Sequence, residues 1–177
     1  KQFDVVECIG VLHHMKNPLD GLDCIIESLN NNGLIKLGLY SEIGRQSIIK
    51  VRDYIESNKL KSNDKDIRLF RQHVRSNKLQ GVRNLLKSKD FYSISSCRDL
   101  CFHVQEHRFS IDQIRLILKE RKLTFLGFKQ SKKVLDIYEK EFIEDKDRSN
   151  LENWKIIEEK NPDIFSGMYE FWVQKQN

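Results

Sequence analysis

The stretch from residue 3 to residue 40, FDVVECIGVLHHMKNPLDGLDCIIESLNNNGLIKLGLY, decides the fold. Residues 3–9 are a short, β-branched and almost continuous apolar run, which is typical of a central strand covered on both faces. Residues 34–40 form a second run of the same kind. We therefore expect two strands of one buried sheet here, with a crossover between them.

The crossover is predicted to be a helix. Pro18 suits the first helical position, and apolar residues from Leu19 to Leu29 follow helical spacing. Asn31-Asn32-Gly33 then predicts the end of the helix. A strand, a helix and a second strand in this order predict a βαβ unit of parallel strands with a right-handed crossover.

The remainder predicts a helical insertion and two more strands. Residues 41–86 are charged with helical apolar spacing, and residues 90–110 are rich in aromatics and histidines, so we expect a helical insertion at about 41–110. Ser110 predicts the cap of a following helix. Residues 131–160 are again helical, and residues 123–128 and 168–173 predict strands that pair as an antiparallel edge.

Composition limits the class of protein. The chain has 177 residues, of which 39% are apolar, and this suits one globular domain with a sizeable core. No apolar run approaches the ~20 residues that a membrane-spanning helix needs, and no leader opens the chain. The four cysteines form no CxxC pair, which suits a reducing compartment. We expect a soluble, cytoplasmic protein.

The net charge of +5 arises from Lys and Arg scattered among nearly as many acids. Solubility explains this charge as well as a partner does, so nucleic acid is not favoured as a partner. The chain begins at Lys1, without Met and two residues before a strand that should lie inside a sheet. We expect it to be a fragment that lacks the N-terminal half of the same domain.

The motif FDVV…VLHHMKNPLDGL…LNNNGLIKLGLY resembles the region from the fourth to the fifth strand of class I S-adenosylmethionine-dependent methyltransferases. The segments DFYS, CRDLCFHVQEHRFS, LTFLGF and GMYEFWV resemble the substrate cap and last strands of a bacterial subgroup often fused to tetratricopeptide repeats. The resemblance implies a partial Rossmann-like α/β sheet with strands 4, 5, 7 and 6 in that order and a helical cap. All of residues 1–177 would be the C-terminal part of one methyltransferase domain.

The resemblance implies S-adenosyl-L-methionine as cofactor. Ligands of such sheets lie beyond the carboxyl ends of strands, near the switch in strand order. Five residues at the end of the first strand are therefore expected to line the sulfonium end: Cys8, Ile9, Gly10, Leu12 and His13. A glycine-rich turn and an acidic ribose ligand of the family are absent, so we expect the fragment alone to be inactive.

Methyl transfer needs an aligned acceptor and a group that removes its proton. Histidine suits the second task because its pKa lies near neutrality, so His13 is a candidate catalytic residue, as is Tyr40 at the end of the second strand. Packing of the turn and core is the alternative for both. No metal is expected, because the HxxEH pattern at 103–107 lacks a distal acidic ligand.

An unidentified acceptor would be bound in a pocket closed by the insertion. The candidate residues for this pocket are Arg45, Tyr92, Arg98, His103, Glu106 and His107. The alternative is a buried polar network that holds the cap, with Glu106 paired to Arg98. Phe165, Tyr169, Phe171 and Trp172 are expected to pack in the core and along an edge strand, and a stacking surface for a planar substrate is the alternative. A non-catalytic binding module and an RNA-modifying or RNA-binding protein remain the alternative functions.

Overall fold

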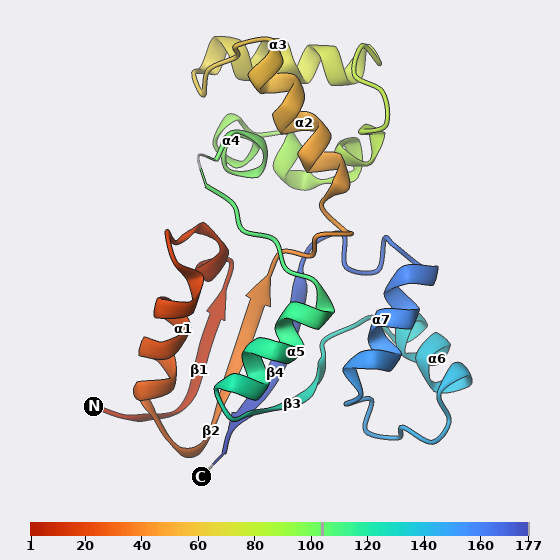
Figure 1. The fold of residues 1–177 in the computed structure, drawn as a ribbon. Helices are drawn as coiled ribbons and strands as arrows, with labels where there is room; N and C mark the ends of the chain where they lie inside the picture. The colour runs from red at the N-terminus through yellow and green to blue at the C-terminus, as the bar shows by residue number, and fades with distance from the viewer. Residues whose placement is uncertain (104, 177) are drawn as a thin grey trace. The chain divides into compact units, whose positions relative to one another are not determined.

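The computed structural model describes residues 1–103 and 105–176. It divides into two compact units: unit 1 comprises Lys1–Gly44 and Gln105–Asn177, and unit 2 comprises Arg45–Val104. The insertion expected at 41–110 thus contains unit 2, while residues 41–44 and 105–110 belong to unit 1 (Figure 1).

Unit 1 is built on a four-stranded sheet in the order β1-β2-β4-β3. Its strands are β1 (Phe3–Ile9), β2 (Leu29–Leu39), β3 (Leu123–Phe128) and β4 (Tyr169–Lys175). β1 and β2 are parallel, whereas β4 runs antiparallel to both β2 and β3. The predicted βαβ unit, strand order and antiparallel edge are therefore confirmed.

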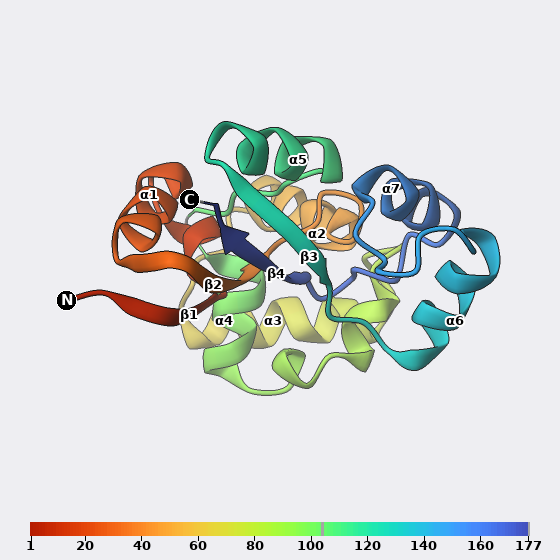
Figure 2. The ribbon, with the colours of Figure 1, turned by 90° about the horizontal axis from the view of Figure 1, so that it is seen from below.

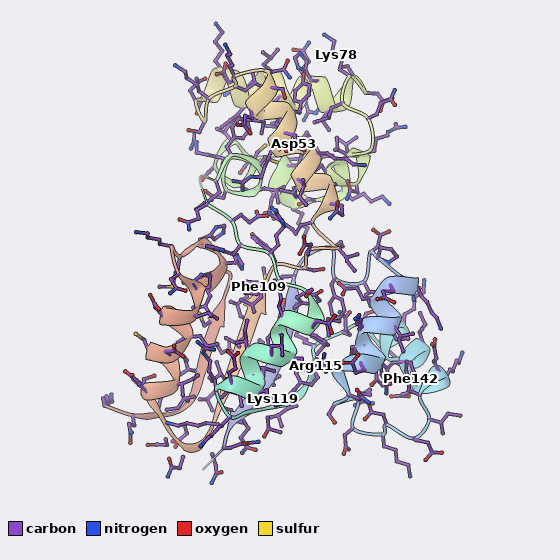
Figure 3. All side chains as sticks on the ribbon, in the orientation of Figure 1. Asp53, Lys78, Phe109, Arg115, Lys119 and Phe142 are labelled. Atoms are coloured by element: carbon purple, nitrogen blue, oxygen red, sulfur yellow. The ribbon has the colours of Figure 1, made fainter. Side chains whose placement is uncertain are left out.

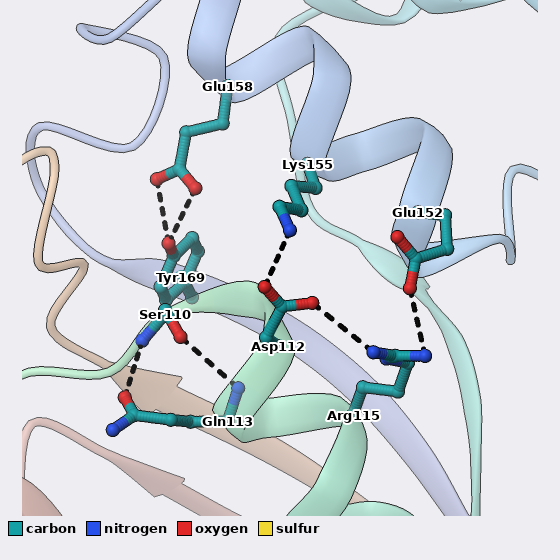
Figure 4. A network of polar contacts seen from close by, with 8 residues as sticks. All are labelled: Ser110, Asp112, Gln113, Arg115, Glu152, Lys155, Glu158 and Tyr169. Carbon is teal, nitrogen blue, oxygen red and sulfur yellow. Dashed lines mark hydrogen bonds and ion pairs between the residues drawn. The ribbon is translucent and has the colours of Figure 1, made fainter.

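The helices α1 (Pro18–Glu27) and α5 (Ile111–Glu120) cover the same face of this sheet (Figure 2). Both begin as the sequence predicts. Asn17 caps α1 by accepting from the Leu19 N–H, with Pro18 at the first helical position. Ser110 and Gln113 form a reciprocal capping box at the start of α5 (Figure 4).

The predicted end of the first helix is wrong by several residues. α1 ends at Glu27, and β2 already begins at fully buried Leu29. Phe3 lies opposite Leu29 and Val5 opposite Leu34, so the intervening Asn/Gly residues bulge out of the ladder. The same residues that stop helices also tolerate such a bulge, and Asn32 takes a φ of 60° there.

The expectation that the first strand is covered on both faces is also wrong for the described chain. β1 is the outermost strand, with β2 as its neighbour. Phe3 is 44% and Val5 is 51% exposed. An outermost strand leaves one edge and the uncovered face in water, and this accounts for the exposure of both side chains.

The core of unit 1 lies between the covered face of the sheet and its helices. Ile35, Leu37, Phe171 and Val173 of β2 and β4 are at most 1% exposed. Phe165 and Tyr169 join this core, as predicted. Trp172 points to the opposite face, where the Lys36 ammonium lies 5.8 Å from its ring centroid, because alternate strand residues face opposite sides.

Two further helices, α6 (Lys132–Glu141) and α7 (Leu151–Lys160), complete unit 1. Trp154 of α7 is fully buried beside Tyr138 of α6, with ring centroids 4.3 Å apart. α7 is joined to α5 by ion pairs: Asp112 lies 2.6 Å from Lys155, and Arg115 lies 2.9 Å from Glu152 (Figure 4).

Unit 2 is helical. It contains α2 (Gln46–Ser57), α3 (Asp64–Arg75), η2 (Arg83–Lys87), η3 (Lys89–Phe91) and α4 (Ile94–Phe102). Its separate core includes Val51, Ile67, Phe70, Phe91 and Cys97, all fully buried. In the described parts of both units, no helix is long and apolar enough to cross a membrane.

Gly44 provides a test of the packing at the end of unit 1. A Cβ at Gly44 would lie 2.7 Å from the Phe165 carbonyl carbon, and this backbone cannot move aside as a flexible side chain can. We expect Gly44→Ala to lower the free energy of unfolding by about 1–3 kcal/mol, measured by urea denaturation. Gly167→Ala is the control, because a Cβ there meets no described atom within 4 Å. Equal stability of the two variants would contradict this packing.

Candidate functional site

The carboxyl end of β1 leads into an open turn. Gly10 follows the strand with a φ of +75°, and a Cβ there would meet no heavy atom of the described residues within 4 Å. Glycine adopts this conformation without steric cost. Burial raises the pKa of the neighbouring Cys8 thiol, although a hydrogen bond with the Leu12 backbone opposes the shift. Cys8 is thus a half-buried thiol at ordinary pH, and the space beside Gly10 is open.

The short helix η1 (Leu12–His14) follows this turn and carries the two adjacent histidines. The Leu12 side chain packs in the core of unit 1. The His13 ring is fully buried and stacks on Tyr40, with centroids 3.7 Å apart and planes 24° apart. The His14 ring meets His13 edge-on at 4.4 Å. The structure therefore brings together the two predicted catalytic residues, His13 and Tyr40, from the ends of β1 and β2.

The segment from Gln105 to Phe109 crosses the carboxyl ends of these two strands. The His107 N–H donates to the His13 carbonyl at 2.8 Å, and the Phe109 N–H donates to the Tyr40 carbonyl at 2.9 Å. Phe109, labelled in Figure 3 at the start of α5, also forms a bridge with Ser41. The segment is thus attached by main-chain hydrogen bonds on both sides of the His13–Tyr40 stack.

Side chains of the same segment add polar contacts. The Gln105 amide nitrogen lies 3.2 Å from the Met15 carbonyl and 3.1 Å from His107 Nε2. With the amide donating to both, Nε2 of His107 is the acceptor and its ring proton sits on Nδ1. His14 Nδ1 donates a hydrogen bond to the Gln105 backbone carbonyl at 3.0 Å. Nothing in the sequence marks Gln105, which joins His14 to His107.

A buried carboxylate lies against the residue that follows the end of β2 and Tyr40. Glu158 is 2% exposed and accepts from the Ser41 hydroxyl at 2.7 Å and from the Tyr169 hydroxyl at 2.7 and 2.8 Å (Figure 4 shows the tyrosine bonds). The Gly44 N–H in turn donates to Ser41 Oγ at 2.9 Å. Burial raises the pKa of the Glu158 carboxyl, and the two hydroxyl donors partly offset this shift. Burial likewise raises the pKa of Tyr169.

Glu158 could not be found from the sequence. It lies in a charged helical stretch, and nothing near it indicates a buried carboxylate. Its partner Ser41 is 117 positions away. These hydrogen bonds hold Ser41, which follows Tyr40, against Glu158 of α7. They are costly to break, because a buried carboxylate without its donors would carry a large desolvation cost.

Glu106 and His107, two of the expected acceptor-binding residues, lie in the crossing segment of unit 1. The Glu106 side chain is fully buried, and its carboxylate lies 3.7 Å from Arg108. Arg98, the alternative partner expected for Glu106, pairs with Asp64 within unit 2 at 2.8 Å. The crossing segment therefore places Glu106 and His107 in the same unit as the His13–Tyr40 stack.

The other four acceptor candidates lie in unit 2. Arg45 is 3% exposed and precedes α2, and His103 follows α4. Arg98 Nε donates to the Ser62 carbonyl, so this side chain ties α4 to the start of α3. The Tyr92 hydroxyl donates to the Leu86 carbonyl. Arg98 and Tyr92 thus have structural partners within unit 2.

The HxxEH pattern is not a helical metal site. α4 ends at Phe102, His103 and residues 105–108 are not helical, and Val104 lies outside the described residues. Among the described residues, no group of three or more His, Cys, Asp or Glu is placed to hold a metal ion.

Solved structures with the same fold are known. PKMT2 from Rickettsia typhi in complex with AdoHcy superposes with a TM-score of 0.67 at 16% identity, over 99% of this chain and 36% of that chain. PKMT2 in a second structure gives a TM-score of 0.68 at 13% identity, again over 99% and 36%. Together with the strand order, this likeness shows that the chain has a class I methyltransferase fold.

Sequence comparison finds a relative that matches part of the chain. The chain is 28% identical over 134 residues to the uncharacterized protein syc1184_c of Synechococcus sp. The match covers 72% of this chain and 32% of that protein. No protein-family model matches the chain. The chain spans about a third of the length of the relatives it matches.

Glu158 gives the site a testable pH dependence. Because folding raises the pKa of this carboxyl, the folded protein holds the proton more tightly than the unfolded chain does. The resulting stabilisation is complete below the unfolded pKa of about 4.3 and is lost as the pH rises through the higher folded pKa.

We expect Glu158→Gln, which keeps an acceptor for a hydroxyl, to lack this component. As the pH rises from about 4 to about 8, the unfolding free energy of the wild type should therefore fall relative to that of the variant. Urea denaturation at several pH values measures this difference, in which all other titrating groups cancel. A difference that stays constant over the whole range would show that Glu158 keeps its ordinary pKa.

Proposed function

We propose that the intact protein containing this chain transfers a methyl group from S-adenosyl-L-methionine to an acceptor. The observation that carries the proposal is the likeness of the whole described fold to PKMT2 in complex with AdoHcy. The open space beside Gly10 supports it, because this space lies at the carboxyl end of β1. In doubly wound sheets that end of a strand is where ligands bind.

The residues at this end of β1 fit such a cofactor. Gly10 presents backbone with no side chain, which suits close approach of a ligand. Cys8, Ile9 and His13 flank the same turn, and Leu12 contributes backbone because its side chain lies in the core. When bound, the cofactor supplies a methyl group already activated by a sulfonium. The chain then needs to exclude water, orient the acceptor and accept its proton.

Tyr40 is proposed to contact the acceptor and His13 to hold Tyr40 in place. Tyr40 is half-buried, whereas His13, the other ring of the stack, is fully buried. A phenol hydroxyl can hydrogen-bond an acceptor atom or pass a proton from it. The crossing segment, held on both strand ends, would keep water from this edge.

Glu106 and His107 of that segment are the first candidates for binding the acceptor, since they share a unit with Tyr40. For Arg45, Tyr92, Arg98 and His103, which lie in unit 2, a role in acceptor binding stays a prediction. We expect the chain alone to be inactive, because residues 1–177 hold no glycine-rich turn that could approach the methionine part of the cofactor, and because they span about a third of PKMT2. Four cysteines without a disulfide suit a cytoplasmic location.

The cofactor assignment is tested with a pair of glycine variants in the intact protein. Gly10 and Gly81 have φ angles of +75° and +76°, so alanine introduces the same backbone strain at both. Only the Gly10 Cβ would enter the proposed cofactor space. We expect Gly10→Ala to weaken S-adenosylhomocysteine binding at least tenfold by calorimetry, about 1.4 kcal/mol, while Gly81→Ala binds as wild type.

A correctly folded wild type that binds neither S-adenosylmethionine nor S-adenosylhomocysteine would overturn the proposed activity. It would favour the non-catalytic binding module instead. An equal loss of binding in both variants would mean that backbone strain, and not the Gly10 Cβ, weakens binding. The proposed position of the cofactor beside Gly10 would then be wrong.

Tyr40→Phe tests the chemical step. The substitution keeps the ring on His13 and removes the hydroxyl, so cofactor affinity should be unchanged. We expect the rate of methyl transfer to fall by about 10²-fold or more, measured as the transfer of label from isotopically labelled cofactor to acceptors in a cell extract. The control is Tyr54→Phe, which removes a hydroxyl bonded to His73 in unit 2. An unchanged rate in Tyr40→Phe would assign Tyr40 to packing alone.

A further inference from the structure

The charges of the chain are divided between its two units. Residues 45–104 contain 14 Lys and Arg but six Asp and Glu, a formal charge of +8. The residues of unit 1 contain 17 Lys and Arg and 20 Asp and Glu, a formal charge of −3. The net charge of +5 therefore hides a strongly basic helical unit inserted into a mildly acidic one.

Within unit 2 the basic residues are concentrated at one part of the chain. From residue 67 to residue 89 there is no Asp or Glu. This basic segment carries Arg68, Arg71, Arg75, Lys78, Arg83, Lys87 and Lys89. It covers most of α3, the turn after it, η2 and the first residue of η3. Five of the seven side chains lie outside α3 or in its last turn, and all except half-buried Arg71 are exposed.

The basic segment lacks the ion pairs that unit 1 makes. In unit 1, Arg121 lies 2.6 Å from Asp23, Lys129 lies 3.1 Å from Glu170, and Arg148 and Lys160 are also paired with glutamates. Among the described residues, no carboxylate lies within ion-pair distance of any of the seven basic side chains. The positive charge of this segment is thus not neutralised within the chain.

Three of the arginines follow one another along α3. Arg68, Arg71 and Arg75 are spaced by three and four positions, so they lie along one side of the helix. Like charges at such spacing repel one another. Favourable interaction with the helix dipole explains Arg75 in the last turn, but it does not extend to Arg83, Lys87 and Lys89, which lie outside α3.

An exposed aromatic ring accompanies the arginines. Tyr92 is 51% exposed, and the Arg75 guanidinium lies 5.8 Å from its ring centroid. The Tyr92 hydroxyl bond to Leu86 fixes the ring against η2. Lys78, labelled in Figure 3, lies just beyond the C-terminus of α3. An arginine and an anchored aromatic ring therefore lie side by side on unit 2, and a lysine follows the end of the same helix.

We propose that this surface of unit 2 binds the phosphodiester backbone of a single-stranded nucleic acid. Guanidinium forks match phosphate oxygens, and an aromatic ring beside them offers a stacking face for a base. Neutralisation by phosphates would relieve the repulsion along α3. A membrane is less well matched, because the apolar side of α3, formed by Ile67, Phe70 and Val74, is already buried in the core of unit 2.

The test is fluorescence anisotropy of a labelled oligouridylate of about 16 nucleotides with the intact protein, over salt from about 50 to about 200 mM. The binding constant should fall steeply with salt, because each neutralised phosphate of a single strand contributes about 0.7 to the slope. Neither methyl donor nor acceptor is present, so failure here is distinct from failure of the proposed methyl transfer.

The triple variant Arg68→Gln, Arg75→Gln, Lys78→Gln should make the salt slope shallower by about 2 and weaken binding at low salt at least tenfold. All three side chains are exposed, and circular dichroism checks that the variant is folded. The double variant Arg68→Lys, Arg75→Lys keeps the charge and should retain most of the slope. The control, Lys119→Gln, Lys132→Gln, Lys133→Gln, removes the same charge from exposed positions of unit 1 and should bind as wild type.

Three results would overturn the proposal: absence of oligouridylate binding at low salt, unchanged binding by the first triple variant, or an equal loss in the control. Polyglutamate and vesicles of phosphatidylcholine with phosphatidylserine serve as competitors. Tighter binding of either one than of oligouridylate would assign the surface to an acidic polypeptide or an anionic membrane instead.

Discussion

The parallel pairing of β1 with β2 is the constraint on which the rest of unit 1 depends. Val5 to Ile9 of β1 lie in register with Leu34 to Gly38 of β2, so both strands end at the same level of the sheet. This common end brings His13 and Tyr40 into stacking contact. It also gives the crossing segment two strand ends to bond to, through His107 and Phe109. A shift of one residue would turn every side chain of a strand to the other face and separate these groups.

Local rules in the sequence predicted the elements that depend on local chemistry. Pro18 and Ser110 were correctly placed at helix starts, because a missing N–H and a hydroxyl acceptor act within one turn of helix. The four strands were found from apolar runs. The start of β2 was missed, since Leu29 satisfies both helical spacing and a strand, and only its pairing with Phe3 decides between them. The face that Trp172 takes could not be predicted, because alternation along a strand does not tell which face is covered.

The site could be predicted only in part, for the same physical reason. The residues at the ends of β1 and β2 follow from the order of elements, so His13 and Tyr40 were within reach of the sequence. Glu158 and Gln105 were not, since each depends on contacts with residues far away in the chain, such as Ser41 and Met15. The basic surface was hidden for another reason: the whole-chain composition averages two units of opposite charge.

The bridge between Ser41 and Phe109 has a consequence for how the chain is put together. The backbone leaves unit 1 just after Ser41 and returns to it just before Phe109, and these two residues are neighbours. The strand pairing of unit 1 therefore needs no residue of unit 2. Joining two adjacent points with a longer segment costs only a logarithmic amount of closure entropy. Such a fold can accept a different inserted segment at this position while the register of its strands stays the same. The residues at the strand ends and the surface of unit 2 can therefore change independently of each other.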